Sequence, residues 1–138
     1  NFLLRRLKKA ARAGIDVRIL LPRKSDVAFM PWASNAFYKR LLKAGVRIFE
    51  YELSMLHAKT LIIDDWMTIG SSNLNYRSLR HDLEADVNIR LPKSKKMLEQ
   101  QFLIDLQSSR EIVLEDWQKR PWYQHFIGRI LLYVKYLI

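Results

Sequence analysis

The sequence lacks cysteine altogether and has few acidic residues. The absence of cysteine excludes a disulfide scaffold and a thiolate metal site. Because 14 acidic residues stand against 24 basic ones, the formal net charge is +10. This excess favours an anionic partner, which could equally be nucleic acid, an anionic lipid surface or a phosphate-bearing substrate. No cluster of carboxylates has the spacing that divalent ions need, so the sequence requires neither a metal nor another cofactor.

Long apolar runs are missing as well. The mostly apolar stretch from Phe126 to Ile138 is too short and too charged for a membrane-spanning helix, which needs about 20 residues. The hydrophobic content of 49% nevertheless excludes a disordered chain. At 138 residues the chain has the length of one domain and can bury a core.

Periodicity predicts an α/β protein with a central mixed sheet flanked by helices. Apolar residues at helical spacing indicate a helix over residues 2–13, which Gly14 ends. Two interpretations stay open for its basic residues, which form either an anion-binding surface or an ordinary solvated face. The other expected elements are strands at 16–21, 46–51, 61–63, 67–69 and 85–91, a helix at 34–44 capped by Ser34, and a helix that Ser94 caps and that ends near Ser108.

The segment from residue 55 to residue 73 concentrates the chemistry. Its run Leu61–Ile63 is apolar without alternation, which predicts a strand covered on both faces. Side chains two positions apart on a strand point the same way, so His57 and Lys59 should share one face. They would set a nucleophile or base beside a fixed positive charge. Asp64 lies at an odd offset from Lys59, and we expect it to brace the turn rather than touch a substrate.

The residues after the next strand, Gly70 to Asn73, are small and polar. A tight turn of such residues lets backbone and side-chain donors approach an anion. We therefore expect this turn to lie where an anion can bind.

The combined pattern H-x-K-x4-D followed by G-S-x-N resembles the signature of the phospholipase D superfamily. Here it is formed by His57, Lys59, Asp64 and the segment Gly70–Asn73. The segment from Asn73 through Glu84 is similar to bacterial cardiolipin synthases, and the likeness extends from the first helix to about Leu91. The chain departs from the family in one respect, because the hairpin between the motif aspartate and the glycine is one residue shorter than is common there.

The resemblance implies one half of a two-lobed phospholipase D-like fold and a phosphohistidine mechanism. His57, Lys59, Asp64 and Glu84 are the implied catalytic residues. Glu84 would hold the far nitrogen of the His57 ring and stabilise the charge that develops on it. Lys59, Ser71 and Asn73 would offset charge on the phosphate oxygens in the transition state. His81 and His125 match no motif.

In that superfamily two H-x-K sets face each other, whereas this sequence has one. Either a first half precedes Asn1, which we favour because a helical pattern is already under way there, or a second copy of the chain completes the site. We expect residues 1–116 to form the catalytic half. Residues 117–138 mix aromatic and basic side chains, and two interpretations stay open for them: a helix docked on the core, or one at the membrane interface, where Arg120, Arg129 and Lys135 would meet lipid phosphates.

The expected function is therefore a phosphatidyltransferase of cardiolipin-synthase type, acting on phospholipids at an anionic surface. It would be peripheral to the cytoplasmic side of a bacterial cell membrane. Two alternatives remain open from the sequence. One is a phosphodiesterase of the same superfamily that cleaves nucleic acid. The other is a module that binds anionic lipid but is inactive, because the shortened hairpin has disabled its site.

Overall fold

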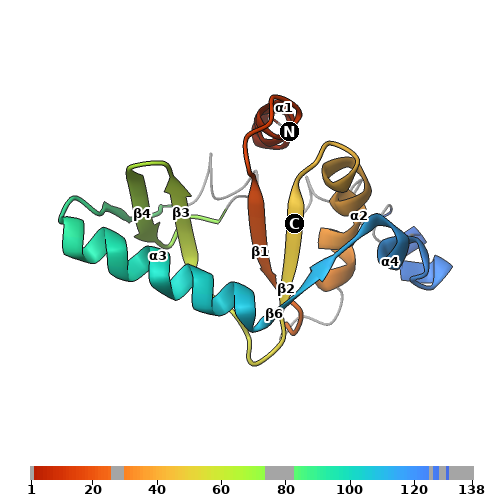
Figure 1. Cartoon of the computed structure of the whole chain (residues 1–138). Coiled ribbons are helices and arrows are strands. Elements are labelled where there is room, and N and C mark those ends of the chain that lie inside the picture. Colours follow the sequence, from red (N-terminus) through yellow and green to blue (C-terminus); the bar gives the residue numbers. More distant parts are fainter. Residues whose placement is uncertain (1, 26–29, 74–82, 125, 128–129, 131–138) are drawn as a thin grey trace. The chain divides into compact units, whose positions relative to one another are not determined.

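A computed structural model of the chain describes residues 2–25, 30–73, 83–124, 126–127 and 130. Contacts divide these residues into two compact units. The smaller unit runs from residue 57 to residue 107, and the larger one contains residues 2–56 and the described residues from 108 onward. Each unit has its own three-stranded sheet and its own helices, which Figure 1 labels. The α/β class expected from the sequence is confirmed, with its strands in two sheets.

The larger unit contains a mixed sheet with the strand order β1-β2-β6. Its first two strands are parallel, and the third is antiparallel to the second. The parallel pair follows from the helix between the two strands in the sequence, since parallel strands need a long crossover. The elements of this unit are α1 (Phe2–Arg12), β1 (Arg18–Pro22), α2 (Met30–Leu42), β2 (Arg47–Tyr51), β6 (Ser109–Ile112) and α4 (Leu114–Gln118).

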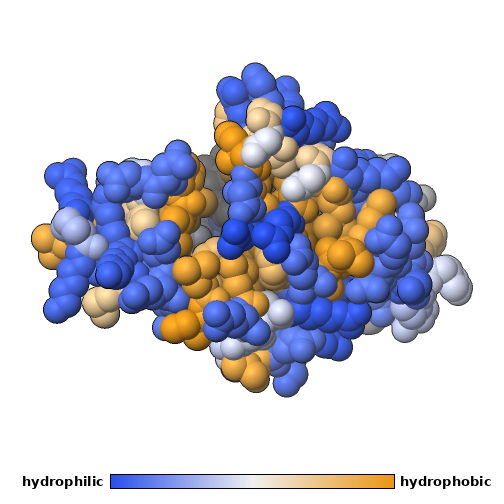
Figure 2. Space-filling view, viewed as in Figure 1, coloured by the Kyte–Doolittle hydropathy of each residue, from blue (hydrophilic) through white to orange (hydrophobic). Residues whose placement is uncertain are grey.

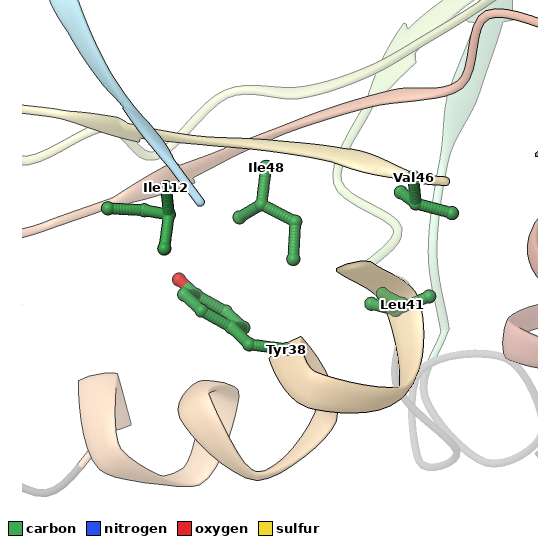
Figure 3. Packing of buried hydrophobic residues seen from close by; sticks show 5 residues of the cluster. All are labelled: Tyr38, Leu41, Val46, Ile48 and Ile112. Carbon is green, nitrogen blue, oxygen red and sulfur yellow. The ribbon is translucent and has the colours of Figure 1, made fainter. Parts of the chain in front are cut away.

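The hydrophobic core of this unit lies between α2 and the sheet. Tyr38 and Leu41 of α2 point toward Val46, Ile48 and Ile112 of the sheet side, as Figure 3 shows, and all five are at most 4% exposed. Leu4 and Ala11 of α1 and Trp117 of α4 pack against this cluster from outside. The apolar stripe of α1 is therefore half-buried against the core, on the side that its periodicity predicts.

A buried carboxylate, Glu50, joins three elements of the larger unit. Only 8% of this β2 residue is exposed, yet it is fully hydrogen-bonded. The Tyr38 hydroxyl donates to its Oε1 at 3.0 Å, and Arg120 Nη2 donates to both oxygens at 2.9 and 3.0 Å. Burial, together with the Glu50 charge, raises the pKa of Tyr38 well above its usual range, so the hydroxyl remains a donor at neutral pH. The network satisfies a charge that would otherwise be costly to bury.

The Glu50 network bears on one of the two interpretations of residues 117–138. At a membrane interface Arg120 would meet lipid phosphates, but its guanidinium binds Glu50 and lies 5.5 Å from the centre of the Tyr38 ring. Trp117, at the start of the same segment, packs against the core. The expected boundary between residues 116 and 117 falls inside α4 and stays a prediction. The other two basic residues named for lipid contact, Arg129 and Lys135, lie outside the described residues.

The smaller unit is an antiparallel sheet with the order β3-β4-β5, followed by one helix. Met67 of β4 is its one buried residue among those described. The prediction that the run Leu61–Ile63 is covered on both faces is wrong at its end, because Ile63 is 52% exposed beside the hairpin turn at the edge of the sheet. The elements are β3 (Lys59–Ile63), β4 (Trp66–Gly70), β5 (Asp86–Asn88) and α3 (Pro92–Gln107).

Both predicted helix caps are wrong. Ser34 lies inside α2, which begins at Met30, and Ser94 lies inside α3, which begins at Pro92. Proline suits the first turn of a helix, because its missing N–H would have no partner there and its φ is already helical. The strand expected over residues 85–91 is also shorter, since only Asp86–Asn88 pairs with β4. Among the described residues no helix is both long and apolar enough to cross a bilayer.

Replacement of Arg120 by methionine should destabilise the larger unit, because it leaves the Glu50 carboxylate buried without its cation. Loss of one partner of a buried pair costs about 3 kcal/mol or more. Arg110→Met is the matched control, since Arg110 pairs with Asp116 at the surface and such a pair contributes at most about 1 kcal/mol. Urea denaturation of the two variants measures the difference, and equal losses would contradict a structural role for the Glu50 network.

Candidate active site

The hairpin of β3 and β4 brings the two ends of the motif together. A two-residue turn, Asp64–Asp65, joins the strands, and the register pairs Ile63 with Trp66 and Lys59 with Gly70. Because the pairing closes at Lys59 and Gly70, the residues before β3 and those after β4 emerge at the same end of the hairpin. The shortened hairpin is therefore fully paired on both sides of its turn, and it brings His57 and the Gly70–Asn73 segment to one place.

A pocket of about 310 Å³ lies at this end of the smaller unit. Five of its lining residues are the site residues predicted from the sequence, and Gly70 is the sixth. His57 precedes the strand rather than belonging to it, but it lines the same pocket as Lys59, two residues later. The side chains differ in exposure: His57, Ser71 and Asn73 are exposed, whereas Lys59 and Glu84 are half-buried. The lining residues are His57, Lys59, Gly70, Ser71, Asn73 and Glu84.

Lys59 is held beside the histidine by a local contact. Its Nζ donates a hydrogen bond of 2.9 Å to the backbone carbonyl oxygen of His57. The ammonium group is thus fixed close to the residue that carries the imidazole, and it retains further N–H donors. A phosphate in the pocket would meet a positive charge that needs no reorganisation, which is the property of a preorganised electrostatic site.

Three hydrogen bonds hold Ser71 in place. Its Oγ donates to Glu84 Oε2 at 2.5 Å and accepts from the Ala85 amide at 3.0 Å. Its own amide donates to the Ala85 carbonyl at 3.0 Å. These bonds tie the end of β4 to the segment that carries Glu84. In the described structure the Glu84 carboxylate is thus bonded to Ser71 and not to His57, so its expected pairing with the histidine stays a prediction.

Two features of this pocket wall are not evident from the motif. Asp86 of β5 accepts hydrogen bonds from the Ser72 amide, at 3.2 Å, and from the Ser72 hydroxyl. Gly70 lies so close to β5 that a Cβ placed there would be 2.6 Å from Asp86 Cα, and closer still to the Ala85 carbonyl oxygen. Gly70 therefore admits the neighbouring strand, a different reason from the anion approach expected from the sequence. Asp86 lies two positions beyond Glu84, and this spacing was the only signal for it in the sequence.

Asp64, the carboxylate of the motif, is not brought into the pocket. It is exposed in the hairpin turn with φ 47°, a left-handed conformation that aspartate tolerates better than most residues. This placement agrees with a role in the turn. Its neighbour Asp65 binds α3, since Lys95 Nζ donates to the Asp65 carboxylate at 2.9 Å and also to its carbonyl oxygen.

No group of three or more potential metal ligands occurs among the described residues. The positive charge in the pocket comes from Lys59. Residues 74–82, which include His81 and most of the segment similar to bacterial cardiolipin synthases, lie outside the described residues.

Comparisons with known proteins agree with one another. A family model described as the PLD-like domain of cardiolipin synthase matches residues 1–106. A cardiolipin synthase of Clostridium perfringens (strain SM101 / Type A) is 38% identical over 119 residues, which cover 86% of this chain and 25% of the relative. Cardiolipin synthase 2 of Bacillus anthracis is 39% identical over 126 residues, or 91% of this chain and 24% of that one. The chain thus spans about a quarter of the length of these curated relatives.

Among solved structures, a phospholipase D family member, Nuc from Salmonella typhimurium, superimposes with a TM-score of 0.66. The match covers 80% of this chain and 73% of that one at 18% sequence identity. At that identity the likeness concerns the fold alone, and it agrees with the phospholipase D-like fold expected from the motif.

Replacement of Gly70 by alanine should disrupt the pocket wall. The new Cβ would overlap backbone atoms of β5, which cannot rotate away, so the strand must shift and carry Ser71 and Glu84 with it. Overpacking of this kind typically costs about 1–3 kcal/mol. Ser72→Ala is the control, because it removes one hydrogen bond to Asp86 without a steric overlap and should cost about 1 kcal/mol. Thermal unfolding and hydrogen exchange of β4 and β5 measure both. An unchanged exchange pattern in the Gly70 variant would contradict the close approach.

Proposed function

The chain belongs to the phospholipase D-like domain family of the cardiolipin synthases, and from this premise we propose that it is a catalytic half of a phosphatidyltransferase that acts on phospholipids. One observation carries the proposal: a nucleophile, a fixed cation and neutral hydrogen-bond donors line one pocket. These are His57, Lys59, Ser71 and Asn73. Displacement at a phosphodiester needs donors to the phosphate oxygens and a nucleophile within reach of the phosphorus, and these residue types can provide both.

In the first step of the proposed reaction, a nitrogen of the neutral His57 imidazole attacks the phosphorus of a donor phospholipid. A P–N bond forms, and the P–O bond to the headgroup alcohol breaks. The departing oxygen takes a proton from a general acid and leaves as an alcohol. The phosphatidyl group is then held on His57 as a phosphohistidine.

In the second step, the hydroxyl group of another lipid attacks the same phosphorus. Its proton passes to the base that formed when the general acid gave up its proton, the P–N bond breaks, and His57 returns to the neutral state. The net reaction exchanges one phosphodiester for another. This near-balanced exchange needs no cofactor and no external source of energy.

The other pocket residues have complementary roles in this proposal. Lys59 and Asn73 would bind the phosphate oxygens and offset the charge that develops on them. Glu84 would orient the imidazole and stabilise its positive charge, with Ser71 passing from Glu84 to a phosphate oxygen when substrate binds. Ser71 and Glu84 already lie in the same wall of the pocket, joined by a hydrogen bond of 2.5 Å, so the exchange requires the Ser71 hydroxyl to leave a strong bond for the phosphate. Asp64 would act indirectly, by holding the hairpin turn.

The general acid must come from elsewhere, since His57 is the one histidine among the described residues. We propose that a second H-x-K set supplies it, from a longer polypeptide or from a second copy of the chain. The chain spans about a quarter of the length of its curated relatives, which leaves room in such proteins for a second set. We also place the active protein at the cytoplasmic side of a bacterial membrane, because its proposed substrates are membrane lipids.

The nuclease alternative and the inactive lipid-binding alternative make different predictions in the same assay. A phosphatidyltransferase releases a headgroup alcohol from lipid vesicles and forms a new phospholipid. A nuclease cleaves DNA or RNA and leaves the vesicles unchanged, and an inactive module binds the vesicles without any product. The net charge of +10 agrees with all three, so product analysis decides between them.

Replacement of His57 by alanine should abolish headgroup release, because no other described residue can form the phosphohistidine. The test uses the smallest active form, either a longer polypeptide or a pair of chains. Activity should fall by more than about 10⁴-fold, beyond the loss of a proton transfer alone. His125→Ala, a histidine that matches no motif, is the control. Activity within about tenfold of the original, a loss of only ~1.4 kcal/mol of transition-state stabilisation, would remove His57 from the mechanism.

The isolated 138-residue chain should be inactive at dilute concentration, because its described pocket offers one histidine where the reaction needs two. If two chains pair to complete the site, activity should rise with the square of the protein concentration. Headgroup release measured over a dilution series, together with sedimentation at the same concentrations, tests this. Full activity from a monomer, proportional to its concentration, would contradict the need for a second set.

A further inference from the structure

The first helix carries a cationic face. Viewed along α1, Arg5, Arg6 and Lys9 lie opposite the apolar stripe, which packs on the core through Leu4 and Ala11, and the other basic residues lie at its border. Figure 2 shows this helix at the top of the view, where its visible surface is largely hydrophilic. The sequence of α1 contains no acidic residue. The basic residues of this face, which we call the α1 face, are Arg5, Arg6, Lys8, Lys9 and Arg12.

The α1 face gathers five basic residues on one helix of 11 residues; exposed cations elsewhere, such as Arg40 and Lys96, also lack an ion pair among the described residues but lie on other segments. Elsewhere in the described structure, six cations form ion pairs with carboxylates, two of them deep enough to have side chains only 20% exposed. None of the five basic residues of the α1 face forms an ion pair with a described residue. The cations that form those pairs are Arg18, Arg23, Arg47, Lys95, Arg110 and Arg120.

The spacing of the α1 face makes these charges repel each other. Arg5 and Lys9, like Lys8 and Arg12, are four residues apart on a helix, a spacing at which like charges oppose helix formation. A bound polyanion would relieve this repulsion along the whole helix. Phe2 adds a second feature. It lies on the cationic side, is 63% exposed, and its ring centre is 5.8 and 4.8 Å from the guanidinium groups of Arg5 and Arg6.

A helix that combines a row of cations with an exposed aromatic ring suits the headgroup region of an anionic bilayer. The cations would meet lipid phosphates, while the ring enters the boundary between headgroups and acyl chains. A helix of this length extends for about 16 Å, enough for several headgroups side by side. We propose that the α1 face docks the protein on an anionic lipid surface. This role deepens the proposed function, because an enzyme whose substrates are bilayer lipids must reside at that surface.

The test compares two quadruple variants of the full chain that have the same net charge. The first replaces Arg5, Lys8, Lys9 and Arg12 of the α1 face by glutamine. The second replaces two arginines and two lysines outside α1 by glutamine as well. All four are exposed: Arg40, Lys43, Arg90 and Lys96. Glutamine forms helices well and removes the repulsion, so α1 should remain folded, which circular dichroism verifies.

Partition is measured by co-sedimentation with vesicles of phosphatidylcholine, with and without phosphatidylglycerol. The original chain should bind the anionic vesicles, and added salt should weaken this binding. At about fivefold for each basic residue at the surface, the α1 variant should bind several hundred-fold more weakly. The second variant should lose far less affinity. At each salt concentration, Phe2→Ser should bind the vesicles more weakly than the original chain does.

Equal losses in the two quadruple variants would overturn the proposal, because net charge and not the α1 face would then control binding. The proposal would also fail if the α1 variant bound anionic vesicles as the original does but lost affinity for a single-stranded oligonucleotide, which would assign the face to nucleic acid. His57→Ala separates this test from the proposed reaction. That variant should bind vesicles normally although it transfers no phosphatidyl group. If the longer polypeptide or the pair of chains with His57 intact bound vesicles but formed no new phospholipid, the proposed function would fail and the docking surface would stand.

Discussion

The close approach of β5 to Gly70 is the constraint on which the candidate site depends. Because no side chain fits between them, the β5 backbone lies directly against the end of β4. That contact brings Ala85 into reach of Ser71 and Asp86 into reach of Ser72. Glu84, one residue before Ala85, is thereby placed against the pocket that begins at His57 and Lys59. A single missing methyl group thus determines where the far wall of the pocket stands.

Although the chain is strongly basic, several of its acidic residues form contacts inside the fold. Glu50 is buried and shared by Tyr38 and Arg120, so it links the sheet to the segment after α4. Glu111 pairs with Arg47 across the same sheet, and the Arg47 hydrogen bond lowers the pKa of that carboxyl group. Most of the described carboxylates form internal contacts, whereas the cations of α1 form no ion pair with a described residue. Five of the unpaired positive charges therefore lie together on one helix.

The sequence predicted the elements better than their ends, and the site better than its internal bonds. Strand periodicity placed His57 beside Lys59. The resemblance to the phospholipase D superfamily indicated Ser71, Asn73 and Glu84, and all five residues line one pocket. The sequence could not predict that Glu84 bonds to Ser71, since that depends on how close β5 approaches. Ser34 and Ser94 have good capping side chains, but α2 and α3 both extend further toward their N-termini than those residues. Arg120 looked like a surface cation because its partner, Glu50, lies 70 positions away in the sequence.

The locality of the pocket also bears on how the protein folds. All its lining residues lie between positions 57 and 84, and the smaller unit that contains them ends at residue 107. The contact order of the pocket is therefore low, and its formation closes loops of fewer than about 30 residues, for which the entropic cost is modest. The larger unit is different, because β6 must return to β2 after the whole smaller unit has been made. The hairpin of β3 and β4 can thus form before β6 has paired with β2 and completed the sheet of the larger unit.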